Sequence, residues 1–398
     1  LIQELLTRSI ATVYPDRAAL EKLLQSGQQL RVYMGIDPTA TYAHLGHATN
    51  YIILKRFHEL GHKVIVLIGD FTAMIGDPSD KSATRQRLTR DQVKANLKTF
   101  KKQIGKILDF TDRQNPIEFE FNSKWLAKLT FADAVELASH FTVQRMLERD
   151  IFERRIKENK PLYVHEFFYP LMQGYDSVAM KVDVEVGGTD QTFNMLAGRQ
   201  LVKAYQNREK IVVTTTLLEN PVTGEKLMSK SLGTGIGLDE SPKGMYGKTM
   251  ALPDEAVVQC FVDCTYLPMA EIAKLQKQLK AGMNPRDAKM RLAREVVAMY
   301  HSAKAAAAAE ADFVSTFRNK STPTDLPTVT VSKPTQNVVE LFVSTGLVAS
   351  KSEARRLIEQ KGLAIDDEIM TDVTALVTVK TGSILRKGKR HFAKVVLK

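Results

Sequence analysis

The stretch LRVYMGIDPTATYAHLGH, residues 30–47, decides the fold of this chain. Residues 30–36 have the pattern of a strand that ends in a loop, and residues 49–60 have helical periodicity. The tetrapeptide HLGH, residues 44–47, lies between them. A glycine there lets a flat or anionic ligand approach the backbone, and the helix N-terminus offers free N–H groups to phosphates. By itself, so short a pattern also occurs by chance in an ordinary loop.

Outward from this stretch, strands alternate with helices. Residues 64–68 form a continuous apolar run, the pattern of a strand buried on both faces. Residues 182–186 and 211–217 predict two more strands, and residues 189–205 predict a helix between them. Strands separated by helices favour a doubly wound parallel sheet of the α/β class.

The pattern changes near residue 242, after which the sequence is helical and poor in strands. Residues 320–335 then contain three prolines among serines and threonines, which is typical of a linker. The sequence therefore predicts four segments: an α/β domain over 1–240, an α-helical domain over 241–318, a linker over 319–334 and a small α+β domain over 335–398.

Composition excludes several classes of protein. Hydrophobic residues make up 44% and charged residues 25% of the 398 residues, which excludes a largely disordered chain or a coiled-coil rod. No apolar run is long enough to cross a membrane, and residues 1–24 lack the pattern of a secretion signal. Cys260 and Cys264 are too few for a disulfide framework or a structural zinc site, so we expect a cytoplasmic protein. The net charge of +11 favours a polyanionic partner.

A second motif, KLMSKSLG, occupies residues 226–233. A lysine in a hydroxyl-rich loop is a mobile charge that can bind phosphates, although a solvated surface loop has the same composition. The two motifs together, in this order, resemble the HIGH and KMSKS motifs of the class I aminoacyl-tRNA synthetases, whose catalytic domain is Rossmann-like. That family has a lysine three positions before Lys230, where this chain has Leu227. Either the loop carries a one-residue insertion that leaves the role to Lys226, or the role is weakened.

A third set of residues selects within that class. It comprises Tyr33 on the first strand, Thr72 and the GDPS turn within 71–80, Tyr169, Gln173 and Asp176, and GGTDQ at 187–191. The spacing of Tyr169, Gln173 and Asp176 places them on one face of a helix, whose start Pro170 leaves open. Each residue alone could have a structural role. The full set resembles the bacterial type of tyrosyl-tRNA synthetase, over nearly the whole chain.

This resemblance implies a set of site residues. Side chains expected to bind substrate tyrosine are Tyr33 and Asp176 at the phenol, Asp77, Tyr169 and Gln173 at the ammonium, and Gln191 near the carboxylate. Residues expected to bind ATP are Gly35, Asp37, His44, Gly46, His47, Gly188, Asp190, Met228 and Lys230. Residues expected to be catalytic are Thr39, His44, His47, Lys81, Arg85 and Lys230.

These residue types suit the reaction that the resemblance implies. The tyrosine carboxylate attacks the α-phosphate of ATP and pyrophosphate leaves, so catalysis consists of positioning and charge stabilisation without a protein nucleophile. Mg²⁺ is expected on the phosphates, and no metal site made by the protein itself is predicted. A pocket that binds a hydroxyl rejects phenylalanine because Tyr33 and Asp176 would be left unpaired.

The tail resembles an S4-type RNA-binding domain. Residues 350–353 have the pattern of a capping box that opens a helix, and residues 362–365 predict a short strand. Basic side chains here would bind RNA phosphates, although a solvated basic surface would have the same composition. The candidate RNA-binding residues are Arg355, Arg356, Arg386 and Lys387.

The resemblance implies the activity of a tyrosine–tRNA ligase. The chain would form tyrosyl-adenylate from L-tyrosine and ATP and transfer tyrosine to the 3'-terminal adenosine of tRNA(Tyr), as a homodimer with residues 110–163 at the interface. Tryptophanyl-tRNA synthetase is the nearest alternative, but Tyr33 and Asp176 suit a phenol better than an indole. A non-catalytic RNA-binding paralogue is the other, and the intact His44, His47 and Lys230 argue against it.

Overall fold

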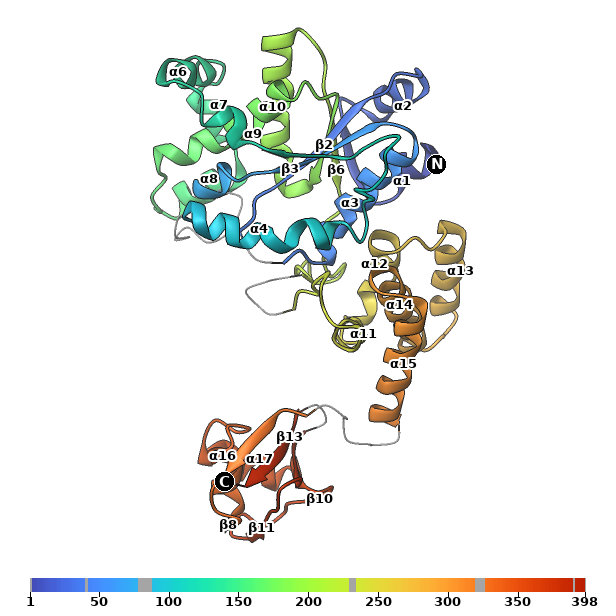
Figure 1. Cartoon of the computed structure of the whole chain (residues 1–398), viewed down its shortest axis with the longest axis vertical. Helices are drawn as coiled ribbons and strands as arrows, with labels where there is room; N and C mark the ends of the chain where they lie inside the picture. Colours follow the sequence, from blue (N-terminus) through green and yellow to red (C-terminus); the bar gives the residue numbers. More distant parts are fainter. Residues whose placement is uncertain are drawn as a thin grey trace. The chain divides into compact units, whose positions relative to one another are not determined.

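The structure is a computed structural model that describes residues 2–39, 42–77, 88–228, 234–318, 326–388 and 391–397. The chain divides into two compact units, Leu1–Glu310 and Ala311–Lys398. Each unit contains a β-sheet of its own (Figure 1), and the two are described separately.

The first unit is built on a sheet that has six strands within the described residues. They are β1 (Ile10–Tyr14), β2 (Arg31–Ile36), β3 (Lys63–Ile68), β4 (Glu118–Phe121), β5 (Val184–Gly188) and β6 (Ile211–Thr215). Their spatial order is β1-β6-β5-β2-β3-β4; β1 is antiparallel to β6, and the other neighbours are parallel. The predicted doubly wound α/β fold is confirmed. The sequence patterns identify β2, β3, β5 and β6 but not the edge strands β1 and β4.

The helices packed on this sheet explain why the central strands are apolar. Helix α3 (Leu45–Glu59) contacts β2, β3 and β5, and α10 (Thr192–Gln206) contacts β5 and β6. Helix α9 (Val164–Ala179) packs closely along α10 at Gly174, where a Cβ would lie 3.1 Å from the backbone nitrogen of Gly198. Pro170 lies inside α9, so Tyr169, Gln173 and Asp176 share one helix, as their spacing predicts.

The topology of the sheet indicates where a ligand would bind, at the carboxyl ends of β2 and β5. These two strands are parallel neighbours, and the strand order proceeds away from them in opposite directions. Ligands bind at the carboxyl ends of strands at such a switch point. Helix α3 follows β2 at this end, and the 3-10 turn η2 (Thr189–Gln191) follows β5. Because α3 begins at Leu45, the HLGH motif forms its N-cap and first turn instead of preceding the helix.

Further helices complete the α/β part of this unit. They are α1 (Ile2–Thr7), α2 (Arg17–Gln25), η1 (Thr72–Met74), α4 (Arg90–Ile104), α5 (Ser123–Leu126), α6 (Phe131–Ser139), α7 (Val143–Leu147) and α8 (Asp150–Lys157). A helical part follows, made of α11 (Pro242–Met250), η3 (Asp254–Ala256), α12 (Val257–Cys264), α13 (Met269–Lys280), α14 (Pro285–Tyr300) and α15 (Ala303–Arg318). The boundary between the two units falls within α15. Among the described residues, no helix is both long and apolar enough to cross a membrane.

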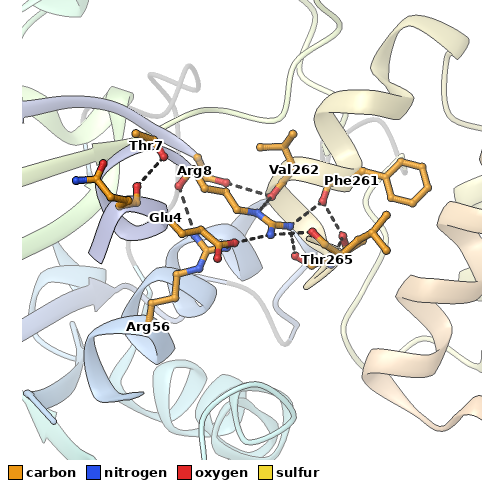
Figure 2. Close-up of polar contacts among 10 residues, drawn as sticks. Glu4, Thr7, Arg8, Arg56, Phe261, Val262 and Thr265 are labelled. Atoms are coloured by element: carbon orange, nitrogen blue, oxygen red, sulfur yellow. Dashed lines mark hydrogen bonds and ion pairs between the residues drawn. The ribbon is translucent and has the colours of Figure 1, made fainter. Parts of the chain in front are cut away.

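Arg8 joins the helical part to the start of the chain (Figure 2). Its guanidinium is buried and donates hydrogen bonds to the backbone oxygens of Phe261, Val262 and Thr265, at 3.2, 2.9 and 2.6 Å. It also forms an ion pair with Glu4 at 2.7 Å. Carbonyl groups at the end of α12, which the helix leaves without N–H partners, thus accept their hydrogen bonds from the N-terminal segment.

The second unit is a small α+β structure. It contains β7 (Thr328–Val331), β8 (Thr335–Asn337), α16 (Val338–Ser344), α17 (Lys351–Glu359), β9 (Leu363–Ile365), β10 (Glu368–Ile369), β11 (Leu376–Thr378), β12 (Ile384–Lys387) and β13 (His391–Leu397). The larger sheet has the order β10-β9-β12-β13-β7, and β11 pairs with β8. Strand β7 falls within the residues assigned to a linker, but it pairs with β13 because its alternating Thr and Val residues suit a strand.

Candidate active site

The HLGH motif forms the start of α3. His44 is the N-cap residue, and His47 is the third residue of the helix. The two ring centroids lie 3.9 Å apart, and the His44 backbone N–H donates to Nδ1 of His47 over 3.2 Å. Both imidazoles are therefore held at a helix N-terminus, where the positive potential favours an anionic group.

Met228 of the second motif lies next to Gly46 of the first motif. A Cβ on Gly46 would lie 3.1 Å from the ring of His44 and 3.5 Å from the Cβ of Met228, which is buried. Only glycine avoids this crowding. The two motifs, which are far apart in the sequence, therefore meet at the N-terminus of α3.

Backbone hydrogen bonds fix the chain on both sides of the second motif. The Leu227 N–H, at the start of the motif, donates to the Leu218 oxygen over 2.9 Å and closes a hairpin there. After the motif, the Leu45 N–H donates to Ile236 over 3.0 Å and the Leu238 N–H donates to Ala43 over 2.8 Å. The predicted residues Lys81, Arg85 and Lys230 lie outside the described residues.

Lys226 reaches the end of β5. Its Nζ lies 3.7 Å from Oδ2 of Asp190, whereas the neighbouring Leu227 is buried. Burial raises the pKa of the Asp190 carboxyl, and the charge of Lys226 opposes this rise. A lysine therefore does lie beside the candidate ribose site, although Leu227 occupies the usual lysine position.

The carboxyl group of Asp176 on α9 is almost fully buried, and the residue is 2% exposed. It accepts hydrogen bonds from Nε1 of Trp125 at 2.6 Å and from Nδ2 of Asn122 at 3.3 Å. Burial raises its pKa well above the usual range, and these two bonds oppose the rise. Tyr33 is fully buried nearby, and its pKa is raised by burial and then by the charges of Glu185 and Asp176.

A second polar cluster joins the residue that follows β2 to helix α9 and the turn η1. The hydroxyl of Tyr169 donates to Oδ2 of Asp37 over 2.9 Å, and the hydroxyl of Thr72 donates to Oδ1 of the same carboxylate over 2.7 Å. Asp37, expected at ATP, thus bonds directly to a residue expected at the tyrosine ammonium. The pKa of Tyr169 is raised by burial and then by the charges of Asp37 and Asp77.

Asp77 anchors the end of β5 to this cluster. It forms an ion pair with Arg149 at 3.0 Å and accepts from Nε2 of Gln191 over 2.7 Å. The remaining side-chain oxygen of Gln191 accepts from Nδ2 of Asn194 over 2.9 Å. The structure thereby brings Asp77 and Gln191 together.

The rest of the expected ATP residues lie at the carboxyl ends of β2 and β5. Gly35 is in the last part of β2, and the Thr39 N–H donates to the oxygen of Asp37 over 2.8 Å. Gly188 ends β5, and a Cβ there would lie 2.6 Å from Oδ1 of Asp190. Within the described residues, no cluster of three or more His, Cys, Asp or Glu side chains could hold a metal ion.

Comparison with known proteins identifies the family. Residues 25–318 match the family described as tRNA synthetases class I (W and Y), and residues 319–395 match the tyrosine–tRNA ligase SYY-like C-terminal domain. The tyrosine–tRNA ligase of Moorella thermoacetica is 48% identical over 395 residues, which are 98% of this chain and 94% of that protein. The one from Carboxydothermus hydrogenoformans is 45% identical over 403 residues, which are 99% and 97% of the two chains. This chain belongs to the tyrosine–tRNA ligases of class I.

Solved structures of the tyrosine–tRNA ligase family have the same fold. A C-terminally truncated mitochondrial tyrosyl-tRNA synthetase of Coccidioides posadasii superimposes with a TM-score of 0.63 and 26% identity, covering 78% of this chain and 91% of that one. The corresponding Aspergillus nidulans structure has a TM-score of 0.66 at 24% identity, covering 79% and 94%. The predicted family is therefore confirmed, and the names of the relatives favour tyrosine over the tryptophan alternative.

The C-terminal unit of this ligase carries the candidate RNA-binding residues. Arg355 and Arg356 are exposed on α17, whose start is capped by Ser350, as its sequence predicts. Lys387 forms an ion pair with Glu353 at 2.8 Å, and Arg386 donates to the backbone oxygen of Gly388 over 3.3 Å. The two arginines of α17 are thus the more accessible pair.

Sequence reasoning missed several side chains of this ligase site. They are Asn122, Trp125, Arg149, Ser177, Glu185 and Lys210. Two had a signal in the sequence, because Glu185 interrupts the apolar strand β5 and Lys210 directly precedes the apolar strand β6. Asn122 and Trp125 had none, since they follow an edge strand that no pattern predicted.

Proposed function

We propose that this chain activates L-tyrosine with ATP, releases pyrophosphate, and transfers the tyrosyl group to the 3'-terminal adenosine of tRNA(Tyr). The observation that carries the proposal is the meeting of two sites. The N-terminus of α3, with His44 and His47, follows β2, the strand that carries the buried phenol Tyr33. The buried carboxyl of Asp176 lies close enough to Tyr33 for its charge to raise the Tyr33 pKa. Family membership supports the same reaction.

The phenol of the substrate is proposed to bind between Tyr33 and Asp176. Asp176 already receives N–H donors from Trp125 and Asn122, so its carboxylate is held in place to accept the phenolic hydrogen. Phenylalanine would leave Asp176 desolvated and without that hydrogen bond, which is costly for a buried charge.

The ammonium group is proposed to lie at the cluster of Tyr169, Gln173 and Asp77. The Tyr169 hydrogen is used by Asp37, so the Tyr169 oxygen is left to accept from the substrate. Asp77 supplies negative charge nearby, and its ion pair with Arg149 and its bond to Gln191 hold it in position. Gln191 would thereby lie near the substrate carboxylate.

Activation is proposed to proceed by in-line attack of that carboxylate on the α-phosphate. His44, His47 and Thr39 would donate to phosphate oxygens, Gly46 and Gly188 would permit close approach, and Asp190 would accept from the ribose. Lys81, Arg85 and Lys230 would neutralise the charge that develops on the leaving pyrophosphate, and Mg²⁺ would arrive bound to ATP as part of that substrate. Positioning and charge stabilisation are then the main catalytic contributions.

Transfer to tRNA is proposed to use the parts that follow the α/β domain. We assign activation to residues 1–240, anticodon recognition to the helical residues 241–318, and RNA binding to the C-terminal unit. Exposed Arg355 and Arg356 on α17 support the last assignment, because guanidinium groups bind phosphates well. Since tRNA charging supplies translation, we propose a cytoplasmic location.

A homodimer is proposed from the distribution of exposed apolar side chains. Large hydrophobic residues that are more than half exposed gather between α6 and the start of α9: Phe131, Val135, Val143, Ile156, Tyr163 and Val164. Such a concentration on one segment is typical of an interface. A second copy of the chain would cover it. All of these residues except Val164 fall within residues 110–163, the segment that the resemblance implies.

The test is ATP–pyrophosphate exchange with each of the twenty amino acids. Exchange with tyrosine alone would support the proposed reaction and pocket together. Exchange with tryptophan or another amino acid would refute the assignment of Tyr33 and Asp176. Binding of tRNA without any exchange would favour the RNA-binding paralogue, for which Leu227 in the second motif is the motivating observation.

A further inference from the structure

A buried ion pair lies next to the pocket proposed for the phenol. Glu185 belongs to β5, Lys210 directly precedes the neighbouring β6, and their side chains are 2% and 0% exposed. Nζ of Lys210 contacts Oε2 of Glu185. Removing two charges from water usually costs about as much free energy as their attraction returns, or more. This pair therefore calls for a role beyond stability.

A first branch of hydrogen bonds connects this ion pair to Tyr33. Lys210 also donates to Oγ of Ser177 over 2.9 Å, and that oxygen lies 2.9 Å from the hydroxyl of Tyr33 and 3.3 Å from Glu185. A charged ammonium can only donate, so Ser177 must accept from Lys210. The Ser177 hydrogen can go to Oε2 of Glu185 over 3.3 Å or to the oxygen of Tyr33 over 2.9 Å, and the shorter distance favours Tyr33.

This direction matches what the bound phenol requires. Tyr33, accepting from Ser177, can donate its own hydrogen to the phenolic oxygen, and the phenol can donate to Asp176. The result is a chain of hydrogen bonds that runs from a cation, Lys210, to a carboxylate, Asp176, all in one sense. Bonds aligned in this way polarise and strengthen one another.

The second branch leads to Gln173, on the same helix as Ser177. Nε2 of Gln173 donates to Oε1 of Glu185 over 3.1 Å. A carboxylate can only accept, so this bond fixes which end of the amide faces Glu185. The Gln173 oxygen is left on the other side, as an acceptor for an ammonium group.

We propose that Lys210 and Glu185 are positioning residues for the substrate tyrosine: the pair sets Tyr33 as donor to the phenolic oxygen and Gln173 as acceptor for the ammonium group. This inference rests on the proposed function and adds two specificity-determining residues to it.

Ser177→Ala is the mildest test of the first branch. It removes one fully buried oxygen on a helix, where alanine is well tolerated, and it leaves the ion pair intact. We expect the KM for tyrosine to rise about tenfold while the KM for ATP and the weak activation of phenylalanine stay the same, because one hydrogen bond to the phenol is lost. Thr249→Ala removes another fully buried hydroxyl, on α11, and is expected to change none of these values.

The double variant Lys210→Met with Glu185→Gln separates positioning from stability. Neutral side chains of similar size remove the cost of burying charge, so the melting temperature should equal or exceed that of the wild type. We nevertheless expect the tyrosine-to-phenylalanine ratio of kcat/KM to fall at least about tenfold. Asp263→Asn, which neutralises a buried carboxyl on α12, is the matched control and should keep the ratio.

The outcomes distinguish this inference from the proposed function. A tyrosine-to-phenylalanine ratio of kcat/KM in Ser177→Ala equal to that of the wild type would overturn the inference. A double variant with both the stability and the tyrosine KM of the wild type would overturn it too, because the pair would then be only structural. Silence of the wild type with tyrosine in the same exchange assay would refute the proposed function itself, and the inference with it.

Discussion

The carboxylate of Asp176 is held by two donors from the segment after β4, Trp125 and Asn122. Asp176→Asn keeps the shape but removes the charge and turns one acceptor into a donor that faces other donors. We expect kcat/KM for tyrosine to fall about 100-fold, because a buried polar group is left unsatisfied, with little change in the KM for ATP. Pyrophosphate exchange at varied tyrosine concentrations measures both values. An unchanged kcat/KM would remove Asp176 from the phenol site.

Gly46 offers a prediction in which stability and activity move in opposite directions. Alanine suits the first turn of a helix better than glycine, so Gly46→Ala should keep or raise the free energy of unfolding, by up to about 1 kcal/mol. Its Cβ would, however, lie 3.1 Å from the ring of His44 and would displace it. We expect kcat for exchange to fall about tenfold or more, as one phosphate donor is misplaced. Denaturant unfolding and exchange kinetics on the same sample check this; unaltered kcat would contradict it.

At single positions, the sequence predicts residues best where their chemistry is tied to a motif. His44, Gly46 and Met228 belong to two recognisable motifs, and the structure brings them together. Ser177 and Lys210 carry no such pattern, because the fold brings the residue before β6 to α9 and no spacing along the chain indicates this contact. Their roles emerge only once the fold is known.

Among the helices, α12 gives a chemical prediction. Cys260 and Cys264 are one turn apart and buried, and burial raises the pKa of Cys260 to about 12. A raised thiol pKa keeps the protonated, unreactive form at pH 8. We expect no reaction with Ellman's reagent at pH 8 in the folded protein and reaction of both cysteines in guanidinium chloride. Rapid labelling of the folded chain would contradict the packing of α12.

The elements themselves were predictable where the apolar pattern was strong. Strand β3 has a continuous buried run, and its position follows from the sequence alone. Strand β4, EFEF, has only half-buried side chains, and β7 lies among prolines, so neither has a clear pattern. Helix α3 begins four residues earlier than its periodicity predicts, since its cap is made by histidine and not by a common capping residue.

For the whole molecule, the division into two units suggests where to shorten the chain. An end at residue 318 keeps α15 complete and removes β7 together with its partner β13, whereas an end at residue 334 would leave β7 unpaired. We expect tyrosine-dependent exchange to stay within about twofold, because the site lies in the first unit, and tRNA charging to fall about tenfold or more as phosphate contacts are lost. Charging assays at physiological salt test this. Equal tRNA charging by the full chain and by the chain that ends at residue 318 would refute the RNA-binding role of the second unit.

The proposed homodimer can be tested by its exposed apolar segment. Phe131→Glu with Val164→Glu places two charges on residues that are 85% and 77% exposed in one chain. We expect the mass measured by light scattering to drop from two chains to one, because burying unpaired charges at an interface is costly. Val222→Glu, at a 75% exposed residue outside the segment, is the control and should stay dimeric. A wild type with the mass of one chain, 44.5 kDa, would refute the dimer.

The guanidinium of Arg8 has a consequence for how the protein is made. Its acceptors Phe261, Val262 and Thr265 lie 253 to 257 positions later in the chain. During synthesis the N-terminal segment therefore emerges from the ribosome long before the carbonyl groups that it will bind, and Arg8 must stay hydrated until they arrive. The acceptors at the end of α12 are synthesised after the whole α/β domain. Arg8 can therefore be buried only after the helical part has been made.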